Sequence, residues 1–243
     1  MQKPLEKDIV VGDQMIHYYH ASSRIQRKGT VVFLHGWGSN STLWFSSTLK
    51  LAEEGYELYF FDLPGFGKSQ TPIHPFHLDD YAQILFNCIQ KLEIERPILI
   101  GHSFGGKTAV RIASKKAISL AGLVLVDSSG LPHTSFATQT KINIAKTVKP
   151  IMDLPLMKGI RSNLLRLSGS DDYIAFPELR ETFVTIIREH IEFELPQVED
   201  KTLILWGGED DNSYTPVSDA EVYKRLIPHA TAYLSKMLAI IVF

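Results

Sequence analysis

The stretch Gly101-His102-Ser103-Phe104-Gly105-Gly106 directly follows the apolar run Pro97-Ile98-Leu99-Ile100. An apolar run that passes into a glycine-flanked serine is typical of a buried strand that delivers the serine into a tight turn before a helix. Such a turn exposes the hydroxyl of Ser103, and glycines at its flanks let the two backbones approach closely. Ser103 is therefore the candidate nucleophile of an acyl-transfer reaction. The alternative is a glycine-serine loop without chemistry.

A second apolar run, Thr30-Val31-Val32-Phe33-Leu34, passes directly into His35-Gly36-Trp37-Gly38. A buried strand followed by a glycine-containing loop is suited to hold an oxyanion, because the glycines let the loop approach the nucleophile. We expect the backbone N–H groups of Trp37 and Phe104 to form this oxyanion hole. His35 is expected to orient the loop rather than to transfer protons.

A third segment ends in Gly67-Lys68-Ser69, which imitates the end of a phosphate-binding loop. A phosphate-binding loop of this type requires a glycine at the position where this chain has Asp62. Nucleotide binding by this segment is therefore excluded.

Five motifs, in this order, together resemble the α/β-hydrolase superfamily, specifically its capped group of esterases, carbon–carbon bond hydrolases and proline iminopeptidases. They are HGWG at 35–38, DLPGFGKS at 62–69, GHSFGG at 101–106, LVLVDSSG at 123–130 and LILWGGEDD at 203–211. The resemblance covers most of the chain. It implies a mostly parallel, twisted sheet with helices on both faces and a small helical cap insertion. The serine at position 103 separates the chain from the haloalkane dehalogenases and epoxide hydrolases of the same fold, whose nucleophile is an aspartate.

By the same resemblance the catalytic acid is Asp210, which follows the apolar run ending at Trp206. An acid at that place orients the histidine of a triad and stabilises its imidazolium form. Asp127 is the alternative acid, because some members of the superfamily carry the acid after the earlier strand at 123–126. A solvated acidic loop is the remaining interpretation of Asp210 and its acidic neighbours.

The histidine that the resemblance implies is absent from its expected place near Ile240. His229 is the last histidine of the sequence and precedes the last expected strand, so it is not expected to be the base. The genetic code allows only codons of the form AAR ATG YTN GCN ATH for Lys-Met-Leu-Ala-Ile at 236–240. Translation that starts at the third base of the lysine codon gives the codons RAT GYT NGC NAT. These codons permit Asn-Ala-Gly-His or Asp-Ala-Gly-His, which is the superfamily's form around the catalytic histidine. We therefore expect a frameshift or an erroneous gene end rather than a natural short variant. The final helix is then also missing, which leaves the last strand partly uncovered.

The composition is that of one enzyme domain with an insertion. The 243 residues are 44% hydrophobic and 21% charged, so they can bury a sizeable core. A formal net charge of −2 and a pI near 6.5 give no electrostatic case for nucleic acid or an anionic membrane as a partner. Cys88 stands alone and the polar N-terminal residues have no apolar signal core, so we expect a cytoplasmic protein without an internal disulfide. No cofactor and no metal site are expected.

Strands are expected as an opening pair within 7–19, near 30–34, 56–61, 97–102, 121–126 and 202–206, and just before residue 236. Helices are expected near 42–54, 77–92, 104–115 and 216–227. This alternation predicts an α/β fold whose ligands bind at the carboxyl ends of the strands. Residues 1–130 and 196–243 form the expected core, and 131–195 the expected cap.

These features predict a serine hydrolase that acts on an ester or a related activated carbonyl of a small molecule through an acyl-enzyme. Without its base, the chain as written is expected to be inactive. One alternative is hydrolysis of a carbon–carbon bond in a dienoic keto acid, which requires a cationic anchor such as Arg161, Arg166 or Arg180. Another is a catalytically inactive hydrolase fold that binds a ligand. Turnover by the purified chain separates the last alternative from both enzymes.

Overall fold

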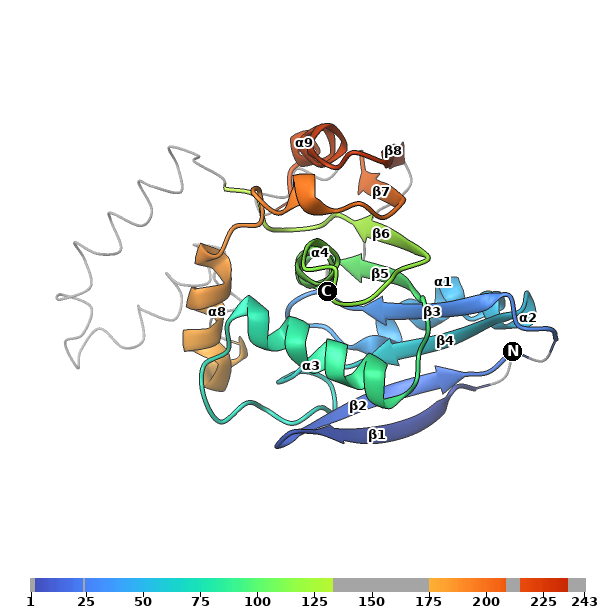
Figure 1. Ribbon diagram of the computed structural model, residues 1–243. Helices are drawn as coiled ribbons and strands as arrows, with labels where there is room; N and C mark the ends of the chain where they lie inside the picture. The colour runs from blue at the N-terminus through green and yellow to red at the C-terminus, as the bar shows by residue number, and fades with distance from the viewer. Residues whose placement is uncertain (1–2, 24, 133–174, 209–214, 236–243) are drawn as a thin grey trace, which may run out of the picture.

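A computed structural model of the chain describes residues 3–23, 25–132, 175–208 and 215–235. These residues form an eight-stranded sheet in the order β1-β2-β4-β3-β5-β6-β7-β8 (Figure 1). Its strands are β1 (Leu5–Val11), β2 (Gln14–Ala21), β3 (Gly29–Leu34), β4 (Tyr56–Phe61), β5 (Ile98–His102), β6 (Gly122–Val126), β7 (Thr202–Gly207) and β8 (Ala230–Ser235). Strands β3 to β8 run parallel, whereas β2 pairs antiparallel with both β1 and β4. The predicted fold class and strands are confirmed.

The central strands are mostly apolar, as expected of parallel strands that are covered on both faces of the sheet. In β3, for example, Val32, Phe33 and Leu34 are fully buried although successive side chains point to opposite faces. The antiparallel pair β1–β2 closes through Gly12, whose φ of +62° is a left-handed conformation that glycine adopts readily.

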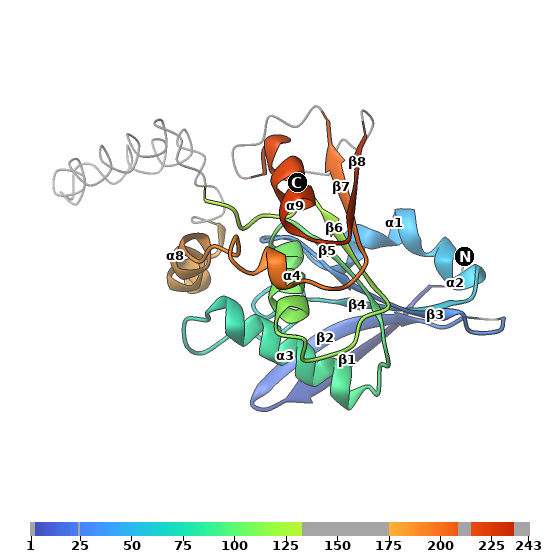
Figure 2. The same cartoon turned by 45° about the horizontal axis from the view of Figure 1, so that its top comes forward.

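Helices cover the two faces of the sheet unequally (Figure 2). Helices α3 (Leu78–Lys91), α4 (Phe104–Ser114) and α9 (Ser218–Leu226) lie on one face, where the larger buried cluster includes Tyr81, Ala109 and Tyr223. The short helices α1 (Phe45–Thr48) and α2 (Lys50–Glu53) lie on the other face, where Trp44 packs on Phe33. The helices predicted at 77–92, 104–115 and 216–227 are confirmed.

The single helix predicted at 42–54 is wrong, because this segment is divided into the 3₁₀ helix η1 (Ser41–Trp44) and the helices α1 and α2. The Thr48 hydroxyl donates a hydrogen bond to the Trp44 carbonyl at 2.6 Å, and the Ser47 hydroxyl donates to the same oxygen at 3.3 Å. Side-chain hydrogen bonds of this kind compete with the backbone ladder of a helix. The break between α1 and α2 lies at Leu49, whose own backbone keeps helical angles of φ −58° and ψ −24°.

The carboxyl ends of three neighbouring strands bring the predicted site segments together. In the sheet register Leu34 of β3 lies opposite Gly101 of β5, and His102 of β5 lies opposite Val126 of β6. The loop containing Trp37, the Ser103 turn and Asp127 directly follow these ends. The expected placement at the carboxyl ends of the strands is thus confirmed for Trp37, Ser103 and Asp127, whereas Asp210 lies outside the described residues.

Strand β8 is the outermost strand on the side of the sheet opposite β1, and its side chains are only partly covered. Tyr233 is 60% exposed and Leu234 is 44% exposed, although the two side chains point to opposite faces. The expectation that the final helix is missing concerns residues 236–243, which lie outside the described residues, and stays a prediction.

Only the last part of the predicted cap, from residue 175, is described beyond residue 132. It contains the 3₁₀ helix η3 (Pro177–Leu179), helix α8 (Arg180–Arg188) and the 3₁₀ helix η4 (Leu195–Gln197). Both views place α8 beside the start of α3, beyond the edge of the sheet (Figures 1 and 2). Arg161, Arg166, Asp210 and Ile240 lie outside the described residues.

Candidate functional site

Ser103 occupies a strained turn between β5 and α4. Its φ of +50° and ψ of −113° lie in a region that non-glycine residues rarely adopt. Such a conformation costs about 1–3 kcal/mol and persists only where the surroundings enforce it. Here the Ser103 N–H donates to the Val126 carbonyl at 3.0 Å, and its own carbonyl accepts from the N–H groups of Lys107 and Ser129 at 3.1 and 3.2 Å. Hydrogen bonds on both the N–H and the carbonyl of Ser103 therefore hold the turn in place.

The glycines that flank Ser103 are sterically required. A Cβ at Gly101 would overlap the carbonyl of Gly105, and a Cβ at Gly105 would overlap the carbonyl of Leu34. A Cβ at Gly106 would lie 2.6 Å from the Ser128 hydroxyl oxygen. Helix α4 consequently begins in direct backbone contact with β3 and β5, as the sequence predicts for positions 101 and 105.

His35 joins the loop after β3 to the loop after β4. Its Nδ1 lies 2.7 Å from the Gly36 carbonyl, and its Nε2 lies 2.9 Å from the backbone N–H of Leu63. Because an N–H can only donate, Nε2 accepts and Nδ1 carries the proton, which makes the ring neutral. Complete burial, which lowers the pKa of His35, favours the same neutral form. The ring thus has the structural role expected of it.

The loop after β3 lies directly against the Ser103 turn. A Cβ built on Gly36 would come within 3.3 Å of the Ser103 Cβ and within 2.9 Å of the His102 Nδ1. The next residue is Trp37, whose backbone N–H makes no hydrogen bond within the part of the chain that the structure describes. Phe104 begins α4, and the first N–H groups of a helix have no partner inside the helix. Two N–H donors are therefore available beside Ser103, and the positive end of the helix dipole favours an anion there.

Aromatic rings surround the Trp37 side chain. Its ring centroid lies 4.9 Å from that of Phe66, 5.1 Å from Phe183 and 5.4 Å from Phe104. Phe66 in turn packs on Phe176 at 5.3 Å. An aromatic cluster therefore lies beside Ser103, and Phe66 and Phe104 within it are buried.

Asp127 is buried at the end of β6 with a positive φ of +39°. Its Oδ1 accepts a hydrogen bond from the Gly207 N–H at 2.9 Å, and its own N–H donates to the Leu205 carbonyl at 3.0 Å. The carboxylate thus fixes the end of β7, the strand that Asp210 follows in the sequence. The choice between Asp127 and Asp210 as the acid stays a prediction, because Asp210 lies outside the described residues.

No described histidine forms a hydrogen bond with the Ser103 hydroxyl. His102 is adjacent in sequence, but burial lowers its pKa to about 4 and its Nδ1 has no hydrogen-bond partner. His229 is exposed in the turn before β8, where its carbonyl accepts from the Thr202 N–H. The position near Ile240 lies outside the described residues.

Lys107 is a buried cation that sequence reasoning missed. Its Nζ donates a hydrogen bond to the Ile186 carbonyl at 2.6 Å, near the C-terminus of α8. Burial lowers the pKa of Lys107 to about 8. One turn further along α4, Arg111 donates to both carboxylate oxygens of Glu194 at 2.7 Å. The helix that begins at the candidate nucleophile therefore also anchors α8 and the segment after it.

Asp62 occupies the loop that imitates a phosphate-binding loop. Its Oδ1 accepts from the Ser41 N–H at 2.7 Å and its Oδ2 accepts from the Lys68 N–H at 2.9 Å. The Asp62 carboxylate therefore ties the loop at 62–68 to the start of η1.

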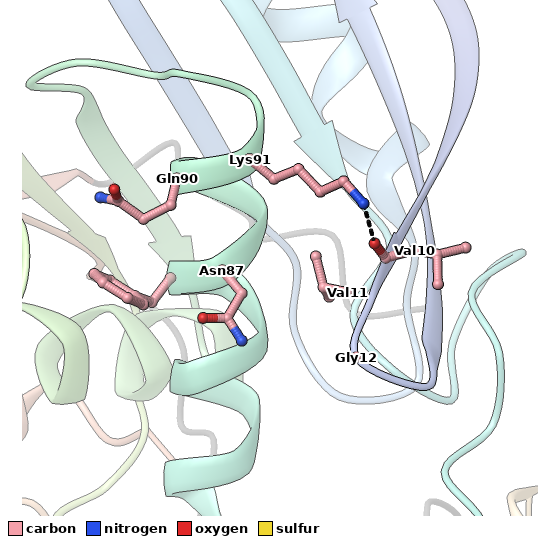
Figure 3. Close-up of a pocket in the computed structure, with 7 residues that line it drawn as sticks. Val10, Val11, Gly12, Asn87, Gln90 and Lys91 are labelled. Atoms are coloured by element: carbon pink, nitrogen blue, oxygen red, sulfur yellow. Dashed lines mark hydrogen bonds between the residues drawn. The ribbon is translucent and has the colours of Figure 1, made fainter.

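Metal-binding clusters, membrane-spanning helices and other hollows were also sought among the described residues. Residues 3–23, 25–132, 175–208 and 215–235 contain no cluster of three or more His, Cys, Asp or Glu residues that could bind a metal ion. None of the helices within these ranges has the length and apolar character needed to cross a membrane. A separate hollow of about 480 Å³ lies between the β1–β2 turn and α3, where the Lys91 ammonium donates to the Val10 carbonyl at 2.8 Å (Figure 3). It shares no lining residue with the Ser103 site.

The class that this sheet and this turn define is that of the α/β hydrolases. A family model described as the alpha/beta hydrolase fold matches residues 29–171, and the chain belongs to this family. Over 197 residues the chain is 30% identical to a pimeloyl-[acyl-carrier protein] methyl ester esterase from Shewanella woodyi, covering 73% of this chain and 74% of that protein. Over 204 residues it is 28% identical to a 2-hydroxy-6-oxononadienedioate/2-hydroxy-6-oxononatrienedioate hydrolase from Escherichia coli, covering 74% of this chain and 70% of that protein.

Solved structures share the fold. A membrane phospholipase A, described as a bacterial virulence factor, matches with a TM-score of 0.74 and 24% identity, over 95% of this chain and 78% of that chain. A hydrolase from Pseudomonas aeruginosa matches with a TM-score of 0.71 and 18% identity, over 95% and 90% of the two chains. The protein is thus a hydrolase of the α/β fold.

Proposed function

We propose that the protein is a serine hydrolase that cleaves an ester, or a similarly activated carbonyl compound, of a small molecule through an acyl-enzyme on Ser103. The observation that carries this proposal is the Ser103 turn. A non-glycine residue is held there at a φ of +50°, at the N-terminus of α4 and against the loop that contains Trp37. Strain of this kind is typical of a nucleophile elbow.

In the proposed reaction the Ser103 Oγ attacks the substrate carbonyl carbon while a base removes its proton. The carbonyl oxygen becomes an oxyanion that accepts hydrogen bonds from the Trp37 and Phe104 N–H groups. Collapse of this intermediate breaks the bond to the leaving alcohol, which takes the proton from the protonated base. Water then attacks the acyl-enzyme in the same manner and releases the carboxylic acid and Ser103.

Asp210 is our proposed acid, because the β7 end that precedes it is fixed by the hydrogen bond between Asp127 and Gly207. The proposed base is a histidine at the position of Ile240, as the alternative reading frame allows. Residues 236–243 as printed contain no imidazole. We therefore propose that the 243-residue chain needs an added base for turnover, and that residues 131–195 form a cap over the site.

Hydrolysis of a carbon–carbon bond is the second candidate function, and the Escherichia coli relative favours it. Such a substrate requires a carboxylate anchor, for which Arg180 at the start of α8 is the described candidate. We favour the ester because the relative at 30% identity is a methyl ester esterase. Hydrolysis of a dienoic keto acid without hydrolysis of aryl esters would reverse this preference.

The test is rescue of the 243-residue chain by imidazole. Neutral imidazole can replace a missing base, so hydrolysis of 4-nitrophenyl butyrate should rise saturably with imidazole by at least about tenfold, since general base catalysis contributes roughly 10²- to 10⁴-fold. The rescue should grow from about pH 5.5 to about pH 8 as imidazole loses its proton.

Imidazole also cleaves aryl esters in solution, so Ser103→Ala is the essential control. This variant should show only the linear, enzyme-independent increase with imidazole. Equal rates for the two proteins would contradict the proposal and would favour a catalytically inactive, ligand-binding protein.

A further inference from the structure

We propose that two copies of this chain associate through β8, whose outward edges pair antiparallel about a two-fold axis and join the two sheets into one. The partner is therefore a second copy of the chain, and the interface is the uncharged strand Ala230–Ser235. This inference goes beyond the proposed function and does not depend on the chemistry of Ser103.

Strand β8 uses only one of its two edges within the described part of the chain. It is the last strand in the sheet order and pairs with β7 alone (Figures 1 and 2). The Thr202 N–H donates to the His229 carbonyl, and the Gly208 N–H donates to the Ser235 carbonyl. Because the backbone groups of a strand alternate between its two edges, the odd-numbered residues of β8 bond to β7. The outward edge carries the backbone groups of the even-numbered residues, Ala230, Ala232 and Leu234.

One of these outward groups is already used, and this fixes the register of the pair. The Ala230 N–H donates to the Ile227 carbonyl at 3.3 Å, whereas Ala232 and Leu234 have no partner on their outward side among the described residues. Two residues that face each other across an antiparallel pair can exchange two hydrogen bonds. An axis at Tyr233 places Ala232 opposite the partner's Leu234 and Leu234 opposite the partner's Ala232. These two pairs make two hydrogen bonds each, four in total, and need no Ala230 N–H.

The same register brings exposed side chains together on both faces of the joined sheet. Tyr233 is 60% exposed and Leu234 is 44% exposed. At an axis through Tyr233 the two tyrosines form a non-hydrogen-bonded pair, in which the Cα atoms are about 4.5 Å apart and the side chains lie closest. On the opposite face Leu234 lies beside the partner's Ala232. Aromatic and apolar cross-strand pairs of this kind stabilise a sheet.

Charge distinguishes β8 from β1, the strand at the opposite border. The middle of β1 carries three charged residues in succession, Glu6, Lys7 and Asp8. The Lys91 ammonium also donates to the Val10 carbonyl at 2.8 Å. Charged side chains, lysine above all, keep an edge strand from pairing with another chain. Pairing through β8 alone therefore closes as a dimer and does not continue into a row of copies.

The first experiment is sedimentation of the 243-residue chain over about a hundredfold range of protein concentration. The average mass should approach twice the 27.4 kDa of one chain at high concentration and should not exceed it. A chain that stays monomeric, or that grows beyond the dimer, would overturn the proposal.

Ala232→Pro tests whether the outward backbone forms the interface. Proline lacks only an N–H that points away from β7, and proline is tolerated on an edge strand when its missing N–H faces outward. Two of the four intermolecular hydrogen bonds are lost, one from each copy. The dissociation constant should therefore rise at least about tenfold, while the circular dichroism of the monomer stays unchanged.

Tyr233→Lys is a second variant, which leaves the backbone unaltered and serves if Ala232→Pro does not fold. It places two ammonium groups opposite each other at the axis, which is unfavourable, so the dimer should weaken severalfold. Leu5→Lys is the matched control, because it makes the same change of charge on β1 at a side chain that is 54% exposed. It should leave the dimer unchanged. A dimer that survives the β8 substitutions would show that another surface, such as residues 237–243, joins the copies, and would overturn the proposal.

A cysteine cross-link tests the register. The only native cysteine, Cys88, is buried. Tyr233→Cys places two thiols directly opposite each other, with Cβ atoms about 4.5–5.5 Å apart, so mild oxidation with copper phenanthroline should give a disulfide-linked dimer on a denaturing gel. Thr231→Cys is the control on the same face of the same strand, because it lies opposite the partner's Ser235 and should stay unlinked. Equal cross-linking of the two variants, or cross-linking of Thr231→Cys alone, would contradict the axis at Tyr233 and overturn the inference.

Discussion

Replacement of Lys107 by methionine should remove a pH dependence from the stability of the protein. The Lys107 side chain is 3% exposed, and its Nζ donates to the Ile186 carbonyl. Burial lowers its pKa from the ordinary value of 10.5 to about 8, against the opposing influence of Glu189 and Glu194. Methionine fills a similar volume but does not titrate.

The direction of this pH dependence is set by whether the folded or the unfolded state loses the Lys107 proton at the lower pH. Because the pKa of Lys107 is lower in the folded chain, the folded state releases the proton at a lower pH than the unfolded state. The free energy of unfolding therefore rises between about pH 8 and the unfolded pKa of about 10.4, and the contribution of Lys107 is constant below this range. Between pH 7 and pH 9.5 the gain is about 2 kcal/mol.

Urea denaturation at pH 7 and pH 9.5 measures this effect. The difference in unfolding free energy between the native chain and Lys107→Met should increase by about 2 kcal/mol at the higher pH, because all other groups cancel in the comparison. Lys115→Met is the matched control, because it removes a half-exposed lysine just after the same helix. A difference that stays constant with pH for Lys107→Met would refute the burial of its charge.

Three further predictions concern the elbow and the triad. Gly105→Ala should destabilise the protein by about 1–3 kcal/mol in urea, because its Cβ would overlap the Leu34 carbonyl; Gly122→Ala, whose Cβ would lie 3.5 Å from its nearest neighbour, should cost less. A quadruple variant that restores the expected Asn-Ala-Gly-His should raise ester hydrolysis without imidazole by at least about 100-fold. It combines Met237→Asn, Leu238→Ala, Ala239→Gly and Ile240→His. An unchanged rate would contradict the expected reading frame. In that background Asp210→Asn should lower kcat by roughly 10⁴-fold, whereas the same loss in Asp127→Asn would make Asp127 the acid.

The sheet and the elbow could be predicted because their signals are local. The runs that end at Leu34, Ile100 and Val126 are apolar over their whole length, which identifies them as buried parallel strands. The need for glycine at position 105 follows from the tight turn alone and is visible in the overlap with Leu34.

The interruption at 42–54 and the contact between Trp37 and Phe183 could not be predicted with the same reasoning. Hydrophobic periodicity favours one helix there, and it does not resolve a break at a single residue such as Leu49, whose backbone angles stay helical. The contact between Trp37 and Phe183 joins residues far apart in the sequence. The spacing of Leu179, Phe183 and Ile186 could have identified the helix, but not the ring against which it packs.

Isolation of the acyl-enzyme shows whether Ser103 is the nucleophile. The 243-residue chain is treated with 4-nitrophenyl acetate and imidazole, separated rapidly from both, digested and analysed by mass spectrometry. Because water also needs a base to attack the acyl-enzyme, the ester should survive removal of imidazole. We expect one acetyl group, attached to the peptide that contains Ser103 and absent from Ser103→Ala. An acetyl group found only on other peptides, or equally in Ser103→Ala, would contradict it.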